Sequence, residues 1–337
     1  MKKILIAAAA LSVVSCAALA QSSVTLYGVA DVGIGKAKST GDQKWGTEAN
    51  SVVNNSFSVI GLHGAEDLGG GMYAGFRYEG QVNLATGDAD GGVQWNRSAY
   101  VYLKSDSFGT VMLGRNWSPS FMGQYAYELT GMANYSVLWR TFGFGSNGDP
   151  WNNAQIAYMT PTLYGVSAEI AYIPKADGGL LDDGVANQTD RWSANVIYDQ
   201  GPIKAAITAD KSSKTAVGGT ANKMNWSAGG AYKFGDSFAL SASYNHSITG
   251  GGVFVIRSAA MGNRRYGWEL GGSAFMGPFT VTVDLTRDTK NEFSGGKKYT
   301  NGMFEGKYSL SKRTFLYIDY LRLDGDNNYG LGIRHNF

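Results

Sequence analysis

The amino-acid sequence predicts an all-β protein, a sixteen-stranded antiparallel transmembrane β-barrel. Three features of the sequence support this fold class. Apolar and polar residues alternate with a period of two along most of the chain, which is the pattern of a strand with two different faces. The connections between these stretches are alternately short and long. Aromatic residues make up 13% of the chain and recur near the ends of the apolar faces, where a membrane barrel meets the bilayer interfaces.

Residues 1–20 have the features of a secretory signal peptide. The start MKK is basic, the stretch ILIAAAALSVV is apolar, and ALA matches a small-residue cleavage site. The flank VVSC partly matches a lipoprotein site, but ALA followed by Gln is the better match. We therefore expect cleavage after Ala20, with residues 21–337 forming one barrel domain. Cleavage removes the only cysteine, Cys16, so we expect neither disulfides nor a thiolate metal site.

The charge balance argues against nucleic acid as a partner. The full chain has a formal net charge of +2, and loss of the two lysines in MKK reduces it to zero. A chain without a basic surplus lacks the field that attracts nucleic acid. After the signal peptide there is no run of about eighteen apolar residues, so we expect no transmembrane helix.

The first five strands are predicted near residues 23–36, 53–65, 72–84, 93–105 and 110–117. The opening segment SVTLYGVADVGI shows the basis of this prediction. It sets Val24, Leu26 and Ile34 on one face, and Thr25 and Asp31 on the other. Side chains that alternate in this way point to opposite sides of a sheet.

Eleven further strands are predicted near 151–160, 166–174, 189–200, 203–212, 223–234, 238–248, 264–276, 279–290, 298–310, 314–324 and 328–337. The segments RWSANVIYD, NWSAGGAYKF, RYGWELGGS and FTVTVDLTRD alternate like the first strand. The last strand keeps the pattern to the final residue, with Leu331, Ile333 and Phe337 on its apolar face. Because lipid offers no hydrogen-bond partners, this strand must pair with the first one to close the barrel.

The connections predict which ends of the strands lie together. Tight turns are expected near 107–110, 163–165, 200–202, 234–237, 276–278 and 311–313, and longer loops near 37–52, 85–92, 175–189, 213–222, 249–263 and 291–297. Short periplasmic turns and long external loops are typical of outer-membrane barrels. A soluble β-sandwich or propeller also alternates apolar and polar residues. Its apolar faces need a core partner, whereas aromatic residues at the face ends favour the lipid-spanning barrel.

No arrangement of residues supports an enzyme, a cofactor or a metal site. Nucleophilic catalysis needs a nucleophile, a base and an orienting group together, and His63, His246 and His335 offer no such arrangement. The segment GDADGG at 87–92 matches part of a calcium loop but lacks the later acidic ligand, so a flexible polar loop is the favoured interpretation. A gated receptor-transporter needs a plug and more strands than this chain length allows.

The connection 118–150 differs from all the others. A connection of this length is usually functional or disordered, and its many aromatic residues argue against disorder. One interpretation is a cap on the outer surface. The favoured one is an inward-folded loop that narrows a pore, with Glu128 and Asp149 as its acidic residues and Arg140 as its basic residue. A short helix is predicted around YELTGMANY.

Four segments of the sequence resemble the general porins of Gram-negative bacteria, in particular those of β-proteobacteria. These segments are SVTLYGVADVGI at the mature start, GLHGAEDLGGGMYAGFRYE at 61–79, NRSAYVYLKSDSFGTVMLGRNW at 96–117, and the terminal YGLGIRHNF. The resemblance extends over the mature chain and is weakest in the loops. It implies an outer-membrane homotrimer that passes small hydrophilic solutes and ions and contacts outer-membrane lipids and lipopolysaccharide. It also implies a third external loop folded into the lumen, and a terminal residue, here Phe337, that the outer-membrane assembly machinery reads.

The same resemblance implies basic side chains on the wall that faces the third loop. It points to Arg97 in NRSAY and, more loosely, to Arg77 and Arg115. Alternation in MYAGFRYEG independently places Arg77 and Glu79 on one face. Opposite charges across a narrow aperture orient solutes and bias ion passage. Each arginine could equally be an ordinary solvated residue of the lumen or rim.

The sequence does not determine the ion or solute selectivity of the predicted pore. Where many relatives carry an arginine in the second strand, this chain has Val59, so we assume no strong anion preference. The predicted inward loop is rich in aromatic residues, namely Phe121, Tyr125, Tyr127, Tyr135, Trp139, Phe142 and Phe144. They could favour sugars or aromatic acids as solutes, although packing of the loop on the barrel wall is the favoured role.

Overall fold

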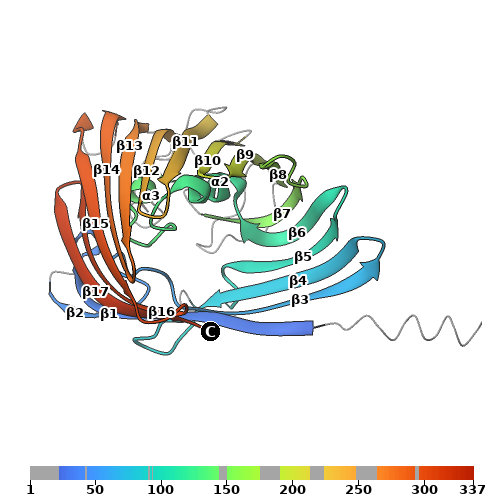
Figure 1. The fold of residues 1–337 in the computed structure, drawn as a ribbon, viewed down its shortest axis with the longest axis horizontal. Coiled ribbons are helices and arrows are strands. Elements are labelled where there is room, and N and C mark those ends of the chain that lie inside the picture. Colours follow the sequence, from blue (N-terminus) through green and yellow to red (C-terminus); the bar gives the residue numbers. More distant parts are fainter. Residues whose placement is uncertain are drawn as a thin grey trace, which may run out of the picture.

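The computed structural model describes residues 23–41, 44–89, 92, 94–143, 150–174, 190–212, 224–247, 264–292 and 296–337. Within these residues, one antiparallel sheet of seventeen strands closes on itself (Figure 1). One strand spans only three residues, Gly46–Glu48. The other sixteen form the barrel wall, which confirms the predicted number. The predicted signal peptide, residues 1–20, lies outside the described residues.

The strands follow the chain around the barrel in sequence order. They are β1 (Ser23–Ala37), β2 (Gly46–Glu48), β3 (Val59–Gly69), β4 (Met72–Gln81), β5 (Ser98–Ser105), β6 (Gly109–Trp117), β7 (Trp151–Met159), β8 (Val166–Ile173), β9 (Arg191–Gln200), β10 (Ile203–Ser212), β11 (Met224–Phe234), β12 (Phe238–Ser247), β13 (Arg265–Met276), β14 (Phe279–Asn291), β15 (Thr300–Ser309), β16 (Thr314–Leu323) and β17 (Asp326–Asn336). The helices are the 3-10 turn η1 (Lys38–Thr40), α2 (Pro119–Tyr127) and α3 (Val137–Phe142). Among the described residues, no helix is long and apolar enough to cross a bilayer.

The two ends of the wall meet at β1. The first part of β1 pairs with β3 along one edge, and this pairing ends with Val29 opposite Val59. The second part of β1 pairs with β17 along the other edge, and this pairing begins with Val29 opposite Asn336. The final residue completes the seam, because Gly28 N donates to Phe337 O at 3.1 Å and Phe337 N donates to Gly28 O at 3.0 Å. A side chain at Gly28 would collide with the Phe337 ring, so the glycine leaves room for the terminal aromatic ring beside β1.

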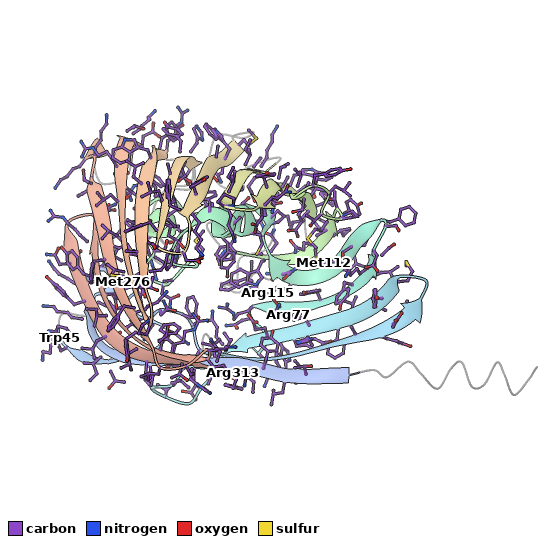
Figure 2. All side chains as sticks on the ribbon, in the orientation of Figure 1. Trp45, Arg77, Met112, Arg115, Met276 and Arg313 are labelled. Atoms are coloured by element: carbon purple, nitrogen blue, oxygen red, sulfur yellow. The ribbon has the colours of Figure 1, made fainter. Side chains whose placement is uncertain are left out.

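Alternation along the strands separates an apolar outside from a polar inside. On the outer face Leu26 and Ile318 are 58% and 54% exposed. Inward-facing polar residues such as Glu269 and Thr282 are fully buried. Figure 2 shows side chains on both faces of the wall, with Arg77 projecting from β4 on the interior side. The sequence-predicted faces of the strands therefore correspond to the two sides of the barrel.

The connection between β6 and β7 packs inside the barrel, where Figure 1 shows α2 and α3 enclosed by the strands. The contacts are polar and reach the buried faces of the strands. Ser120 Oγ lies 2.9 Å from Ser193 Oγ of β9, and Thr141 Oγ1 lies 2.9 Å from Thr286 Oγ1 of β14. Asn195 also donates to the Pro119 carbonyl at 2.8 Å. Helix α2 thus lies against β9 and β10, and α3 against β14.

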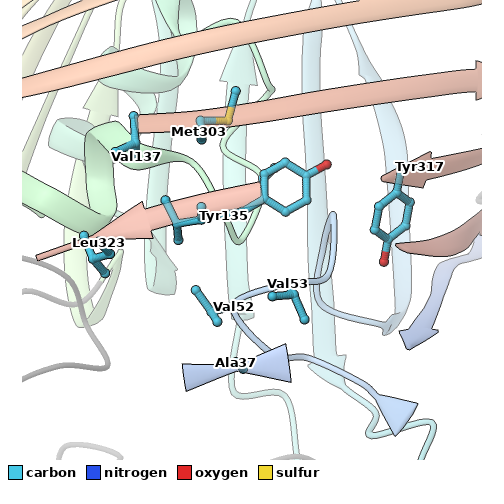
Figure 3. Close-up of a cluster of buried hydrophobic side chains, with 10 residues drawn as sticks. Ala37, Val52, Val53, Tyr135, Val137, Met303, Tyr317 and Leu323 are labelled. Atoms are coloured by element: carbon cyan, nitrogen blue, oxygen red, sulfur yellow. The ribbon is translucent and has the colours of Figure 1, made fainter. Parts of the chain in front are cut away.

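A hydrophobic cluster lies within the barrel beside this connection (Figure 3). Its buried members come from β1, from residues 49–58 between β2 and β3 (the first loop), from the β6–β7 connection, and from β15 and β16. They are Ala37, Val52, Val53, Ala133, Tyr135, Val137, Met303, Tyr317, Leu321 and Leu323. The prediction that the second strand starts at residue 53 is therefore wrong. Residues 49–58 turn inward, because the buried Asn54 amide donates to Asp31 Oδ1, Glu48 O and Tyr317 OH at 3.1–3.3 Å. The wall resumes at Val59.

Deleting Phe337 should impair closure of the barrel. It removes two backbone hydrogen bonds at the β1–β17 seam, which costs about 2 kcal/mol at roughly 1 kcal/mol per bond, together with the ring that covers Gly28. We expect a lower yield of folded barrel after refolding into detergent, measured by gel mobility with and without heating. Phe337→Leu keeps the backbone bonds and should refold nearly as well as the natural chain. A deletion variant that refolds with full yield would contradict this account of closure.

Candidate pore constriction

A cavity of about 420 Å³ lies inside the barrel between the β6–β7 connection and the wall formed by β1, β3 and β4. We call it the arginine-lined cavity. Among the described residues, its charged lining consists of three arginines and one glutamate, namely Arg77, Arg97, Arg334 and Glu79. Its aromatic lining residues are Tyr27, Phe57, Trp117, Phe121, Tyr125, Trp139 and Trp151. The cavity therefore combines a surplus of positive charge with ring surfaces.

Glu79 holds two of the arginines in place. Its Oε1 lies 2.6 Å from Arg97 Nε, and its Oε2 lies 2.8 Å from Arg77 Nη2. Tyr27 OH donates to Glu79 Oε2 at 2.8 Å and accepts from Arg77 Nε at 2.7 Å. Arg77 and Glu79 reach the same cavity because they are two residues apart on β4, on the face that alternation predicts.

Arg97 is enclosed by aromatic rings. Its guanidinium carbon lies 4.8 Å from the ring centroid of Trp117, 5.0 Å from that of Trp151 and 5.6 Å from that of Phe57. Its side chain is only 10% exposed. A desolvated cation over aromatic faces is stabilised by the ring quadrupoles, so both the rings and Glu79 hold this charge. Arg97 lies directly before β5, and the sequence alternation of that strand does not predict to which side the Arg97 side chain points.

Two further arginines, Arg115 and Arg334, differ in whether they reach the cavity. The family resemblance predicts that Arg115 faces the third external loop, which is the β6–β7 connection. In the structure Arg115 lies on β6 and donates to Asn96 O at 2.7 Å and to Asn153 Oδ1. It is not among the residues that line the arginine-lined cavity. Arg334 on β17 does line the cavity and donates to Asn55 Oδ1 at 2.7 Å. Sequence reasoning missed Arg334, although the alternation of the last strand sets it opposite the apolar face.

Glu128 and Arg140, the charged residues of the β6–β7 connection that the structure describes, hold the connection in shape and do not line the arginine-lined cavity. Glu128 accepts from Thr130 Oγ1 at 2.6 Å and from the backbone N–H groups of Thr130 and Met132 at 2.9 and 2.7 Å. Burial raises the pKa of the Glu128 carboxyl. Arg140 donates to Asn134 O at 2.5 Å and stacks on the ring of Trp139 at 4.0 Å. Asp149 lies outside the described residues.

The helix predicted around YELTGMANY is absent from that place, and this prediction was wrong. Gly131 and Met132 have φ values of +72° and +55°, which break a right-handed helix, and Glu128 closes the resulting turn. The helix α2 lies earlier. It begins after Ser118, whose side chain accepts from Phe121 N at 3.2 Å, and has Pro119 in its first turn.

Four aromatic rings form a ladder along one side of the cavity. The ring centroids of Trp151 and Trp117 are 4.7 Å apart, those of Trp117 and Phe121 are 4.3 Å apart, and those of Phe121 and Tyr125 are 6.2 Å apart. Phe121 and Tyr125 lie four residues apart on α2, which places them on one helix face. Tyr125 ends the ladder and is 48% exposed. We call these four residues the aromatic ladder.

A group of three or more His, Cys, Asp or Glu side chains that could hold a metal ion is not found among the described residues. The segment 87–92, considered above as part of a calcium loop, lies partly outside those residues.

Comparison with known proteins decides the family. A family model described as Gram-negative porin matches residues 7–328. The chain belongs to the Gram-negative porin family. Outer membrane porin protein 32 of Delftia acidovorans is 36% identical to this porin over 352 residues, which cover 99% of this chain and 93% of that protein.

Solved structures agree with this assignment. An anion-selective porin from Comamonas acidovorans is 27% identical and has a TM-score of 0.74, covering 94% of this porin and 100% of that chain. The trimer form of OmpT, an outer membrane protein of Vibrio cholerae, is 13% identical and shares the fold with a TM-score of 0.63, covering 94% of this porin and 99% of that chain. This porin is thus an outer-membrane channel protein and not an enzyme.

Replacing Glu79 by Gln should increase the preference of this porin for anions. The substitution removes the negative charge between Arg77 and Arg97 and keeps the size of the side chain. The matched variant Arg77→Gln removes a positive charge from the same cluster. In a KCl gradient across a planar bilayer, we expect the chloride-to-potassium permeability ratio to rise about two- to threefold for Glu79→Gln and to fall by a similar factor for Arg77→Gln. Equal ratios in all three proteins would contradict a role for this cluster in ion passage.

Proposed function

We propose that the arginine-lined cavity is the narrowest part of a water-filled channel through which small hydrophilic solutes and ions diffuse passively. The observation that carries this proposal is the position of the β6–β7 connection. Its two helices lie against β9, β10 and β14 inside the barrel, so the remaining passage runs past the opposite wall, where Arg77, Glu79 and Arg334 lie. A loop folded inside a barrel reduces its aperture, and charges at a narrow aperture act strongly on passing ions.

The channel proposal predicts stepwise conductance of the purified porin in a planar bilayer. Tyr125→Ala should raise the single-channel conductance, because it trims an exposed side chain from the cavity lining. Tyr164→Ala is the matched control. Tyr164 is 92% exposed in the turn between β7 and β8, and its loss should leave the conductance unchanged. A folded barrel that inserts and conducts nothing would instead indicate an adhesin or structural barrel with a closed lumen.

The charge of the cavity supports a modest anion preference. Of the residues that the structure describes, three arginines and one glutamate line it, which gives this part of the lining a surplus of two positive charges. The relative from Comamonas acidovorans is described as anion-selective. The family resemblance implies an arginine in many relatives at the place of Val59, so we expect a smaller surplus in this porin than a full basic ladder would give.

We expect this porin to work as a homotrimer within outer-membrane lipids and lipopolysaccharide. The family resemblance and the trimer form of OmpT support this state. The mass of the unheated porin in mild detergent should equal that of three chains plus bound detergent, measured by light scattering combined with refractive index. A mass of one chain would refute the trimer and leave the channel proposal standing.

Phe337 has a second proposed role as the residue read by the assembly machinery. The family resemblance supports it, and its exposure on the outer face, 48%, leaves the ring accessible. This role can be tested separately from closure of the β1–β17 seam. Refolding into detergent depends on closure alone, because the assembly machinery is absent from that experiment.

A further inference from the structure

The exposed end of the aromatic ladder has no evident structural purpose. The neighbouring side chains of α2 are buried against the barrel wall, with Phe121 at 8% and Tyr127 at 1% exposure. Tyr125 is 48% exposed and lines the cavity. Its hydroxyl has no hydrogen-bond partner within the part of the chain that the structure describes. The inner rungs pack around Arg97, but this outermost ring presents an open face to the passage.

The same cavity offers cations that can reach a passing anion. Arg77 has a side chain that is 36% exposed, and Arg334 comes from the other side of the seam on β17. Glu79 is the single carboxylate among the described residues of the lining, and its two oxygens are already bonded to Arg77 and Arg97. Guanidinium groups bind carboxylates through paired, planar hydrogen bonds. The surplus of arginine therefore favours an anionic group within reach of the ring.

We propose that the exposed end of the aromatic ladder and the reachable arginines form a binding subsite for aromatic carboxylates, anions of the benzoate type. The ring of such a solute stacks on Tyr125, and its carboxylate bonds to Arg77 or Arg334. The subsite lies in the proposed constriction, so this inference rests on the channel function and names a solute class for it. A cavity of about 420 Å³ has room for a solute with one ring together with water.

The charge of the lining distinguishes this solute class from sugars. Aromatic rings also stack on the apolar faces of sugars, but a neutral sugar forms no ion pair with the arginines and accepts only ordinary hydrogen bonds from them. An aliphatic carboxylate would use the arginines and lose the stacking. Only a planar aromatic anion both stacks on Tyr125 and pairs with the arginines. The test therefore compares an aromatic carboxylate, an aliphatic carboxylate and a sugar.

Binding is measured first on the whole porin in detergent micelles by saturation-transfer NMR, and then as inhibition of chloride conductance in planar bilayers. The probes are benzoate, cyclohexanecarboxylate, which has the same charged group on a saturated ring, and maltose. We expect benzoate to act at concentrations about fivefold lower than cyclohexanecarboxylate, the factor given by one stacked aromatic pair, and maltose to be weaker than both.

Variants of Tyr125 test whether the preference for benzoate over cyclohexanecarboxylate depends on the aromatic ladder. Tyr125→Leu should abolish the advantage of benzoate over cyclohexanecarboxylate, while Tyr125→Phe should keep it. Tyr164→Leu, at the remote turn, should also keep it. Equal action of benzoate and cyclohexanecarboxylate on the natural porin, an advantage that survives Tyr125→Leu, or maltose acting as strongly as benzoate would each overturn the inference. The absence of chloride conductance would refute the channel proposal alone, because the measurement in micelles still decides the subsite.

Discussion

Closure of the sheet is the constraint on which the rest of the structure depends. A strand edge in lipid would leave backbone N–H and C=O groups without partners, and β1 meets this requirement by pairing with both β17 and β3. The partner of β1 changes from β3 to β17 at Val29, which lies opposite Val59 on one side and Asn336 on the other. A closed wall in turn creates an interior shielded from lipid. Charged groups can be buried there if they are paired, as Arg265 is with Asp288 and Asp324 at 2.9 and 2.5 Å.

The polar interior explains how the β6–β7 connection comes to lie inside. Hydroxyl and amide groups on β9, β14 and β15 bond to Ser120 and Thr141 of the connection. The Tyr135 hydroxyl donates to Glu305 and accepts from Asn55 of the first loop at 2.8 Å. Asn55 also accepts from Arg334. The first loop therefore links the tip of the connection to an arginine of the opposite wall, and it helps to set the aperture between them.

The wall could be predicted from the sequence because strand alternation is a local pattern that burial on only one face enforces. The same pattern placed Arg77 and Glu79 on a common face and could have placed Arg334. It could not place Arg97, which precedes a strand whose two faces are both apolar. It also failed at residues 53–58, where the predicted strand begins at Val53, a residue that is buried inside the barrel in one cluster with Tyr135 and Tyr317, which are distant in the sequence. The roles of Glu128 and Arg140 depend on the turns of the connection, which local patterns do not specify.

The arrangement of arginines in the cavity depends on Glu79. Two guanidinium groups so close together would repel each other strongly in a lumen less polar than water, and the carboxylate between them offsets that repulsion. Its bonds to Arg77 and Arg97, completed by Tyr27, make one unit with a net charge of +1. Because Arg97 is enclosed by rings, we expect it to act on a passing ion only through its field. Arg77 is partly exposed and can bond a solute directly. In the proposed constriction, the field and the direct contacts thus come from different arginines of one unit, so we expect a change at Arg77 to alter both and a change at Arg97 to alter the field alone.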